Sequence, residues 1–141
     1  TEELTDHRAA KAVRLMGEDL VLFQDDNGSY GLVERRCPHR GADLFYGRLE
    51  DGGLRCLFHG WLFDVNGRCL EQPAEPPGST FHTKVNLKSY PCREVNGIIF
   101  AYMGPGSPPA LPYFDCFIAP DSHSFAFKGY LECNFVSSTT K

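Results

Sequence analysis

Two short segments of the sequence contain side chains that could do chemistry together. The first reads Cys37-Pro38-His39-Arg40-Gly41, and the second reads Cys56-Leu57-Phe58-His59-Gly60-Trp61. Each segment offers one thiolate and one imidazole, and sixteen residues separate His39 from Cys56. Thiolate sulfur and imidazole nitrogen are ligands that suit zinc and iron–sulfur clusters. The spacing therefore predicts a metal centre held by Cys37, His39, Cys56 and His59, which two separate loops would contribute.

The order of these four residues distinguishes two kinds of metal site. A structural zinc site would hold all four side chains in one tetrahedron and join two hairpins. Zinc-finger sequences, however, group the cysteines in one pair and the histidines in another, whereas each segment here holds one of each. In a Rieske [2Fe–2S] centre two histidines replace two cysteines on one of the two irons, so each loop can donate one ligand to each iron. The mixed pairs favour the Rieske centre, and a zinc-stapled structural module is the alternative.

Turn signals divide the chain into short strands that would position the two loops. Three Asn-Gly pairs suit the positive φ angles of a type I′ hairpin turn, and an Asp-Gly-Gly triplet marks a fourth turn. The hairpins that they predict join residues 20–23 to 30–33, 47–49 to 54–56, 61–63 to 69–70, and 87–90 to 98–102. Short strands at this spacing indicate an all-β chain, folded as a small antiparallel β-sandwich or barrel with two cluster-binding hairpin loops. Residues 5–15 give a weak helix signal, although residues 13–15 could instead begin a strand.

The composition is that of a globular protein and argues against several kinds of partner. Of the 141 residues, 42% are hydrophobic and 23% are charged. With 14 Lys and Arg against 18 Asp and Glu, the net charge of −4 provides no basic surface for nucleic acid. No segment approaches the roughly 20 apolar residues of a membrane span, and residues 1–14 do not have the pattern of a secretory signal. Six cysteines without such a signal predict a reducing, cytoplasmic location.

The sequence around both segments resembles a known family. CPHRGADL and CLFHGWLFDVNGRC are similar to the cluster motifs of the Rieske domain in ring-hydroxylating, non-haem iron oxygenases. The stretches GEDLVLFQDDNG and SYPCREVNGIIFAYMGP resemble the strands before and after those motifs. Within the family, the chain is similar to the oxygenase components of phthalate and phenoxybenzoate dioxygenases and of the related aryl O-demethylases. The resemblance spans residues 13–134.

The resemblance implies a Rieske-type 2Fe–2S cluster and a role for each of its four ligands. Cys37 and Cys56 would bind the inner iron, which stays ferric. His39 and His59 would bind the outer iron, which takes the electron, and their free ring edges would lie near the surface. Trp61 stands where the family packs an aromatic ring against the cluster loops.

Differences from another branch of the same fold indicate a low reduction potential. Respiratory-chain Rieske proteins carry a disulfide between cysteines at the positions of Ala42 and Phe58, and a serine at the position of Trp61. Hydrogen bonds to the cluster sulfurs raise the potential because they stabilise the more negative reduced state. Without that serine and that disulfide, the potential is expected toward the low end of the Rieske range of about −150 to +300 mV.

The resemblance also implies that the chain is part of a longer oxygenase subunit. Residues 1–104 would form the Rieske domain, residues 105–120 a Pro-rich linker, and residues 121–141 the first strand of a truncated catalytic domain. The catalytic domain would hold a mononuclear Fe(II) through two histidines and a carboxylate, and that ligand pattern is absent from this sequence. We therefore expect the chain to carry one electron and not to oxidise an aromatic acid substrate by itself.

The expected partners follow from the same resemblance. A reductase or ferredoxin would donate the electrons, and full-length family members are often homotrimers. Arg40 would either contribute to the docking of this donor or be an exposed loop arginine without a partner. A stand-alone Rieske ferredoxin is the other electron-transfer interpretation. Ferredoxins of that type generally end near the position of Gly104, so the additional residues favour the oxygenase interpretation.

Overall fold

A computed structural model describes residues 10–112, 114–118 and 120–123. The contacts between Cα atoms divide the chain into two units, Thr1–Leu111 and Pro112–Lys141. The described strands all belong to the first unit, and the second holds the short 3₁₀ turns η4 (Asp115–Phe117) and η5 (Asp121–His123). Most of the strand expected within residues 121–141 lies outside the described residues.

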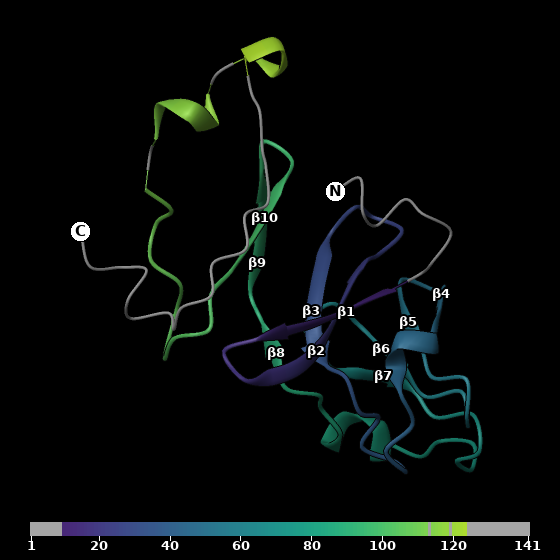
Figure 1. Ribbon diagram of the computed structural model, residues 1–141. Coiled ribbons are helices and arrows are strands. Elements are labelled where there is room, and N and C mark those ends of the chain that lie inside the picture. Colours follow the sequence, from purple (N-terminus) through teal and green to yellow (C-terminus); the bar gives the residue numbers. More distant parts are fainter. Residues whose placement is uncertain (1–9, 113, 119, 124–141) are drawn as a thin grey trace. The chain divides into compact units, whose positions relative to one another are not determined.

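The first sheet has four antiparallel strands in the order β1-β2-β3-β8 (Figure 1). Its strands are β1 (Ala10–Leu15), β2 (Glu18–Gln24), β3 (Tyr30–Glu34) and β8 (Ser89–Tyr90). The weak helix signal was therefore wrong for residues 10–15, where pairing with β2 outweighs local propensity. On β3, Gly31 lies opposite Phe23, and a Cβ atom on Gly31 would stand 2.7 Å from the Phe23 ring. The missing side chain at Gly31 leaves room for this ring in the core.

The second sheet is the one that presents the second cluster loop. Its four antiparallel strands follow the chain, in the order β4 (Arg48–Glu50), β5 (Gly53–Arg55), β6 (Leu62–Phe63) and β7 (Cys69–Glu71). Residues 56–61 connect β5 to β6, and residues 35–43 connect β3 to the 3₁₀ turn η2 (Leu44–Tyr46). Both predicted loops therefore leave the ends of strands that are themselves paired within a sheet.

The third sheet is a two-stranded hairpin that differs from the sequence prediction. The strand β10 (Ile98–Ala101) pairs with β9 (Cys92–Val95), and the predicted partner region contributes β8 to the first sheet instead. The 3₁₀ turn η3 (Phe81–Lys84) precedes it. None of the described helices is long or apolar enough to cross a membrane. The predicted all-β, antiparallel fold is confirmed, and the error concerns which strand pairs with β10.

The chemistry of the turns also differs from the simple Asn-Gly prediction. Only Asn96 of the three paired asparagines has a positive φ, 51°, as a type I′ turn requires. In the other two turns, the carboxylates of Asp25 and Asp64 accept hydrogen bonds from backbone N–H groups two and four residues later, at 2.7–3.0 Å. These local hydrogen bonds pair the backbone N–H groups of the turn, so the asparagine does not have to adopt a left-handed conformation.

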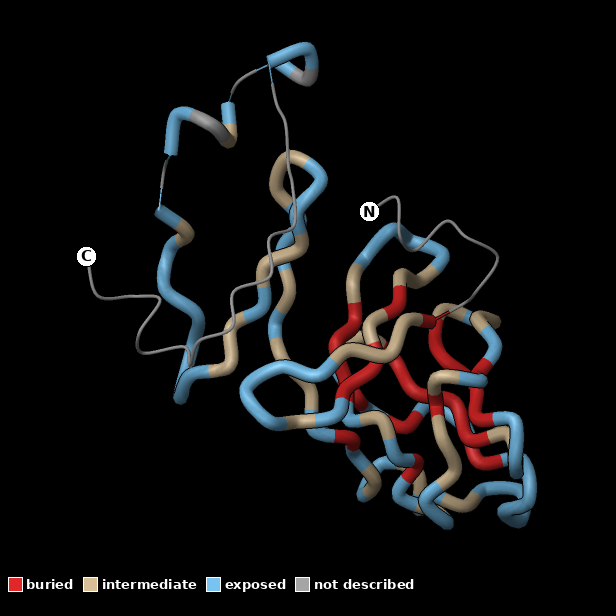
Figure 2. The backbone as a smooth tube through the Cα atoms, viewed as in Figure 1, coloured by how far each residue is buried: buried red, intermediate tan, exposed pale blue. Residues whose placement is uncertain are grey.

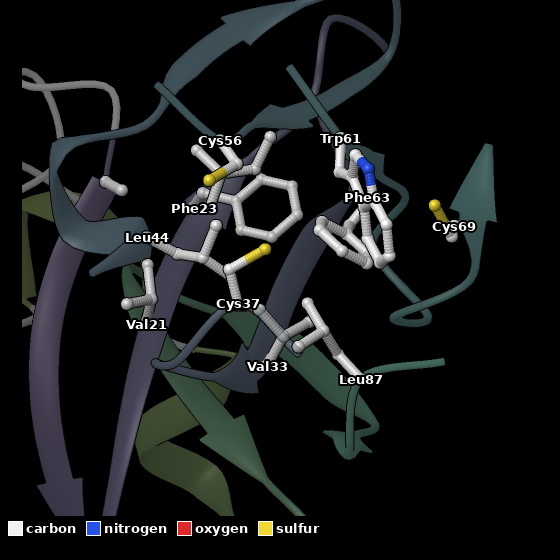
Figure 3. Packing of buried hydrophobic residues seen from close by; sticks show 12 residues of the cluster. Val21, Phe23, Val33, Cys37, Leu44, Cys56, Trp61, Phe63, Cys69 and Leu87 are labelled. Carbon is white, nitrogen blue, oxygen red and sulfur yellow. The ribbon is translucent and has the colours of Figure 1, made fainter. Parts of the chain in front are cut away.

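The core fills the space where the first two sheets meet, and the buried parts of the backbone gather there (Figure 2). Phe23 and Phe63 are its largest completely buried side chains, one from each sheet. The same cluster contains Cys37, Cys56 and Trp61 from the two loops (Figure 3). The predicted cysteine ligands are thus continuous with the apolar core.

Candidate metal centre

The first loop (residues 37–42) is a tight turn closed by two backbone hydrogen bonds. The N–H of Cys37 donates to the carbonyl of Ala42 at 2.9 Å, and the N–H of Gly41 donates to the carbonyl of Cys37 at 2.8 Å. Gly41 has a φ of +70°, in the left-handed region that L-residues with a side chain rarely adopt. The turn places His39 at its tip, two residues after the cysteine.

The second loop (residues 56–61) repeats this frame with different residues. The N–H of Cys56 donates to the carbonyl of Trp61 at 2.9 Å, and the N–H of Gly60 donates to the carbonyl of Cys56 at 3.0 Å. Gly60 has a φ of +75°, and a Cβ atom there would also stand 3.1 Å from Cγ of Pro73. The two loops therefore share one backbone design, although the histidine follows the cysteine by two residues in one and by three in the other.

The two thiols lie close together in the interior. Cys37 and Cys56 are only 2% and 3% exposed. The pKa of the Cys37 thiol is raised to about 11, chiefly because burial deprives the thiolate of its hydration. Within this net shift, the N–H of His39 lowers the pKa and the neighbouring Cys56 thiol raises it. A thiolate at this position therefore needs a cationic partner such as a metal ion to be stable at neutral pH.

The two imidazoles lie together nearer the surface. The ring centroids of His39 and His59 are 4.6 Å apart, with the ring planes inclined at 64°. His59 is exposed, whereas His39 is half-buried and stacks on the Trp61 ring, with centroids 4.6 Å apart and planes within 10°. Burial lowers the pKa of His39, and the adjacent His59 and Arg40 act in the same direction. Low pKa values keep an imidazole neutral, which is the form that binds a metal.

Comparison with known proteins identifies the family of the chain. The model of the Rieske [2Fe-2S] domain matches residues 1–91. The chain belongs to the Rieske [2Fe-2S] domain family. A Rieske domain implies a 2Fe–2S cluster, and the family has an electron-transfer role.

Several relatives of this Rieske chain are named as oxygenase subunits. It is 46% identical over 132 residues to the 5,5'-dehydrodivanillate O-demethylase oxygenase subunit of Sphingobium sp. (strain NBRC 103272 / SYK-6), covering 92% of this chain and 31% of that protein. It is 47% identical over 126 residues to the phenoxybenzoate dioxygenase subunit alpha of Ectopseudomonas oleovorans, covering 89% of this chain and 30% of that protein. The chain thus spans about a third of the length of these relatives.

Solved structures agree with this assignment. Dicamba monooxygenase with non-heme iron and dicamba superposes with a TM-score of 0.67 and 29% identity, over 80% of this chain and 35% of the other. The reduced complex between oxygenase and ferredoxin in carbazole 1,9a-dioxygenase gives a TM-score of 0.64 and 29% identity, over 77% of this chain and 28% of the other. The resemblance to ring-hydroxylating oxygenases is therefore found in both sequence and fold.

The four predicted ligands are arranged in a way that fits the Rieske cluster. In the part of the chain that the structure describes, no three His, Cys, Asp or Glu side chains surround one point that could hold a single metal ion. Instead, two neighbouring thiols lie inside and two neighbouring imidazoles lie outside. In a Rieske centre, two cysteines bind one iron and two histidines bind the other. The pair of thiols and the pair of imidazoles would match these two irons.

Arg55 anchors the second loop, and the sequence analysis did not identify it. Its guanidinium is nearly buried, with the residue 9% exposed, and it donates to the carbonyl of Gly60 at 2.7 Å. The same group forms ion pairs with Glu50 at 2.7 Å, Asp51 at 2.9 Å and Glu71 at 2.7 Å. The available signal was an arginine directly before a predicted ligand cysteine, with acidic residues on other predicted strands. Three strands and the loop are tied to this one cation.

The first loop has a smaller anchor, which the sequence analysis also missed. Arg35 binds Asp43 through two charge-assisted hydrogen bonds, Nε to Oδ1 at 2.9 Å and Nη2 to Oδ2 at 2.7 Å. Asp43 also accepts from the N–H of Phe45 at 3.1 Å and so caps η2. The Arg35 guanidinium lowers the pKa of Asp43, and the N–H of Phe45 adds to this effect. The pair joins the two ends of the first loop.

The exposed face around the imidazoles is largely apolar. Leu57 and Phe58 on the second loop are exposed, and the Phe58 ring lies 4.1 Å from the His59 ring between centroids. Arg40 is exposed at the tip of the first loop. Trp61 packs on His39 as the sequence suggested, and its ring also contacts Phe81 of η3 edge-on, with the centroids 6.4 Å apart.

Proposed function

We propose that the chain is the Rieske electron-transfer domain of an aromatic ring-hydroxylating dioxygenase or aryl O-demethylase. Cys37 and Cys56 would hold one iron of the 2Fe–2S cluster, and His39 and His59 would hold the other. The observation that carries this assignment is the paired arrangement of the donors, with buried thiols inside and adjacent imidazoles at the surface. When bound, the cluster supplies one-electron redox chemistry.

The protein residues have separate tasks in this function. The core around Cys37 and Cys56 keeps water away from the sulfur side of the site. Stacking on Trp61 fixes the His39 ring, while the exposed His59 would give a short protein path between the cluster and a docked partner. The apolar side chains of Leu57 and Phe58 beside His59 would provide contact area for that partner. Arg40 would add a charge at the rim of the same face.

The oxygenase context is part of the proposal. Electrons would come from a reductase or ferredoxin and pass to a mononuclear Fe(II) in a catalytic domain, which would act on an aromatic acid. The names of the relatives and the ferredoxin complex of carbazole 1,9a-dioxygenase support this context. Residues 1–104 would form the Rieske domain, residues 105–120 the linker and residues 121–141 the beginning of the catalytic domain. A homotrimeric full-length protein and a cytoplasmic location complete the proposal.

Metal and sulfide analysis tests the assignment directly. The chain, purified under anaerobic conditions, should contain two irons and two acid-labile sulfides, and its reduced form should give an axial EPR signal. Cys56→Ser should abolish cluster binding, because it removes a thiolate ligand. Cys69→Ala is the matched control: Cys69 is also a buried thiol, and this variant should keep the cluster. Stoichiometric zinc without sulfide in the wild-type chain, or full cluster content in Cys56→Ser, would refute the assignment.

A further inference from the structure

The side-chain amide of Gln72 is buried without a hydrogen-bond partner. The residue is only 6% exposed. Among the buried side-chain nitrogen and oxygen atoms of the described residues, Nε2 and Oε1 of Gln72 are the ones that lack a partner. Leaving such groups unpaired destabilises a fold by about 1–3 kcal/mol per group, and native proteins therefore pair nearly all of them. An acceptor for the Gln72 N–H groups is thus expected close to this side chain.

The neighbours of Gln72 place it against the second cluster loop. On one side, the Glu71 carboxylate binds Arg55, which directly precedes Cys56 in the chain. On the other side, the Pro73 ring lies 3.1 Å from the position that a Cβ atom of Gly60 would take. Residues 71–73 therefore contact the second loop near both of its ends, and Gln72 lies between these two contacts.

Within residues 10–112, 114–118 and 120–123, no protein group accepts a hydrogen bond from this amide. The nearby thiol of Cys69 is a weak acceptor, and its own Sγ–H donates to the carbonyl of Glu71 at 3.5 Å. The contact of this thiol with the Gln72 amide lacks hydrogen-bond geometry. The sulfides and thiolates of an iron–sulfur cluster, by contrast, carry negative charge and are better acceptors for an N–H donor.

We propose that Gln72 completes the cluster site by donating a hydrogen bond from its side-chain amide to a sulfur atom of the bound 2Fe–2S cluster. The inference rests on the proposed function. Such a bond stabilises the reduced cluster more than the oxidised one, because reduction adds negative charge to the sulfurs. Gln72 therefore raises the reduction potential of the cluster and is a residue that tunes it.

A redox titration of the cluster-loaded chain tests this inference. Gln72→Met keeps the approximate volume and removes the donor, so its midpoint potential should shift to a more negative value with full cluster content. Gln24→Met is the matched control, because Gln24 already donates to the carbonyl of Gly28 at 3.0 Å; its potential should equal that of the wild type. Equal potentials in all three proteins would overturn the inference.

If the Gln72→Met variant does not bind the cluster, its potential cannot be measured. A spectroscopic measurement on a chain that keeps Gln72 then tests the same hydrogen bond. The sequence has two glutamines, Gln24 and Gln72, so side-chain ¹⁵N labelling of glutamine in Gln24→Met marks Gln72 alone. Pulsed EPR of the reduced cluster should then show a coupled ¹⁵N nucleus, and its absence would overturn the inference. A wild-type chain that contains no labile sulfide would instead refute the proposed function itself.

Discussion

The two cluster loops have the same backbone frame but different anchors. In both, the cysteine N–H bonds to the carbonyl five residues later, and a left-handed glycine bonds back to the cysteine carbonyl. The first loop is closed by the carboxylate of Asp43, which pairs with Arg35 at 2.7 Å and with Arg36 at 3.7 Å. The side chains of Arg35 and Asp43 are 28% and 15% exposed. The second is held by Arg55, which is nearly buried and contacts one carbonyl and three carboxylates.

This comparison distinguishes the features of the site that depend on neighbouring residues in the sequence from those that depend on tertiary contacts. The shape of each loop depends on a few residues adjacent in sequence, so both loops can close in the same way. The orientation of each loop depends on side chains from other strands. The second loop carries the exposed His59 and has the larger anchor.

Removal of the Arg55 side chain should have the largest effect on stability. Arg55→Met keeps an apolar stem but leaves the Gly60 carbonyl without this donor and three carboxylates without this cation. We expect a loss near the lower end of the about 3–5 kcal/mol found when one partner of a buried ion pair is removed, because the carboxylates remain partly hydrated. The measurement is the urea midpoint of the cluster-loaded chain, followed by circular dichroism and by bleaching of the visible absorption.

Arg48→Met is the matched control for this substitution. Arg48 lies on the neighbouring strand and pairs with Glu50 at 3.1 Å, but its side chain is 64% exposed. Surface pairs of this kind contribute about 0–1 kcal/mol. If Arg55→Met and Arg48→Met lowered the midpoint equally, the second loop would not depend on the buried cation.

Substitution of the two loop glycines should have unequal effects. Gly41→Ala and Gly60→Ala each place a side chain at a left-handed φ, which destabilises by about 1–2 kcal/mol. Gly41 has nothing within 4 Å of its Cβ position, whereas a Cβ atom on Gly60 would approach Pro73 to 3.1 Å. Overpacking there should add about 1 kcal/mol to the loss in Gly60→Ala.

Urea midpoints of the two variants, measured as for Arg55→Met, give the comparison. Gly28→Ala is the reference variant, because Gly28 is a left-handed glycine (φ +79°) in a hairpin turn away from the predicted ligand residues. Only the flexible Gln24 side chain lies near its Cβ position, so the loss of stability in this variant measures the cost of the left-handed φ alone. A Gly60→Ala variant as stable as Gly41→Ala would show that Pro73 gives way without loss of packing.

The sequence specified the parts of the site that are close together in the chain. The spacing of Cys37 and His39, and of Cys56 and His59, sufficed to predict two ligand-bearing turns, because each turn is built from adjacent residues. Arg55 and Gln72 were missed because their roles depend on strands β4, β5 and β7 being brought into one sheet. One sequence contains no direct record of such pairings.

The fold was predicted with the same strengths and weaknesses. Turn signals between short apolar runs identified an all-β antiparallel chain, and three of the four predicted hairpins occur as β2–β3, β4–β5 and β6–β7. The fourth was misplaced because residues 87–90 and 92–95 both have strand-like sequences. The choice between them depends on β8 bonding to β3 and on the two-residue turn at Asn96, which favours the nearer partner.

Removal of the Asp43 charge should have the smallest effect of the three and a defined pH dependence. Asp43→Asn retains an acceptor for the N–H of Phe45 but loses the charge that pairs with Arg35. We expect a loss of about 1 kcal/mol at pH 7 for this partly exposed pair. Because Arg35 lowers the pKa of Asp43, the contribution is fully present above the ordinary Asp pKa of about 3.9 and disappears as the pH falls through the lower folded value.

The measured quantity is the difference in urea midpoint between wild type and Asp43→Asn at pH 7 and at pH 3. Asp19→Asn is the control, since Asp19 pairs with Arg14 on the surface at 3.1 Å and its loss should be near zero at both pH values. No loss of stability in Asp43→Asn at either pH would mean that the cap on η2, which asparagine retains, and not the charge, holds the first loop. The first loop would then be stabilised by a backbone contact and the second by a buried cation, so the two anchors would differ in kind as well as in size.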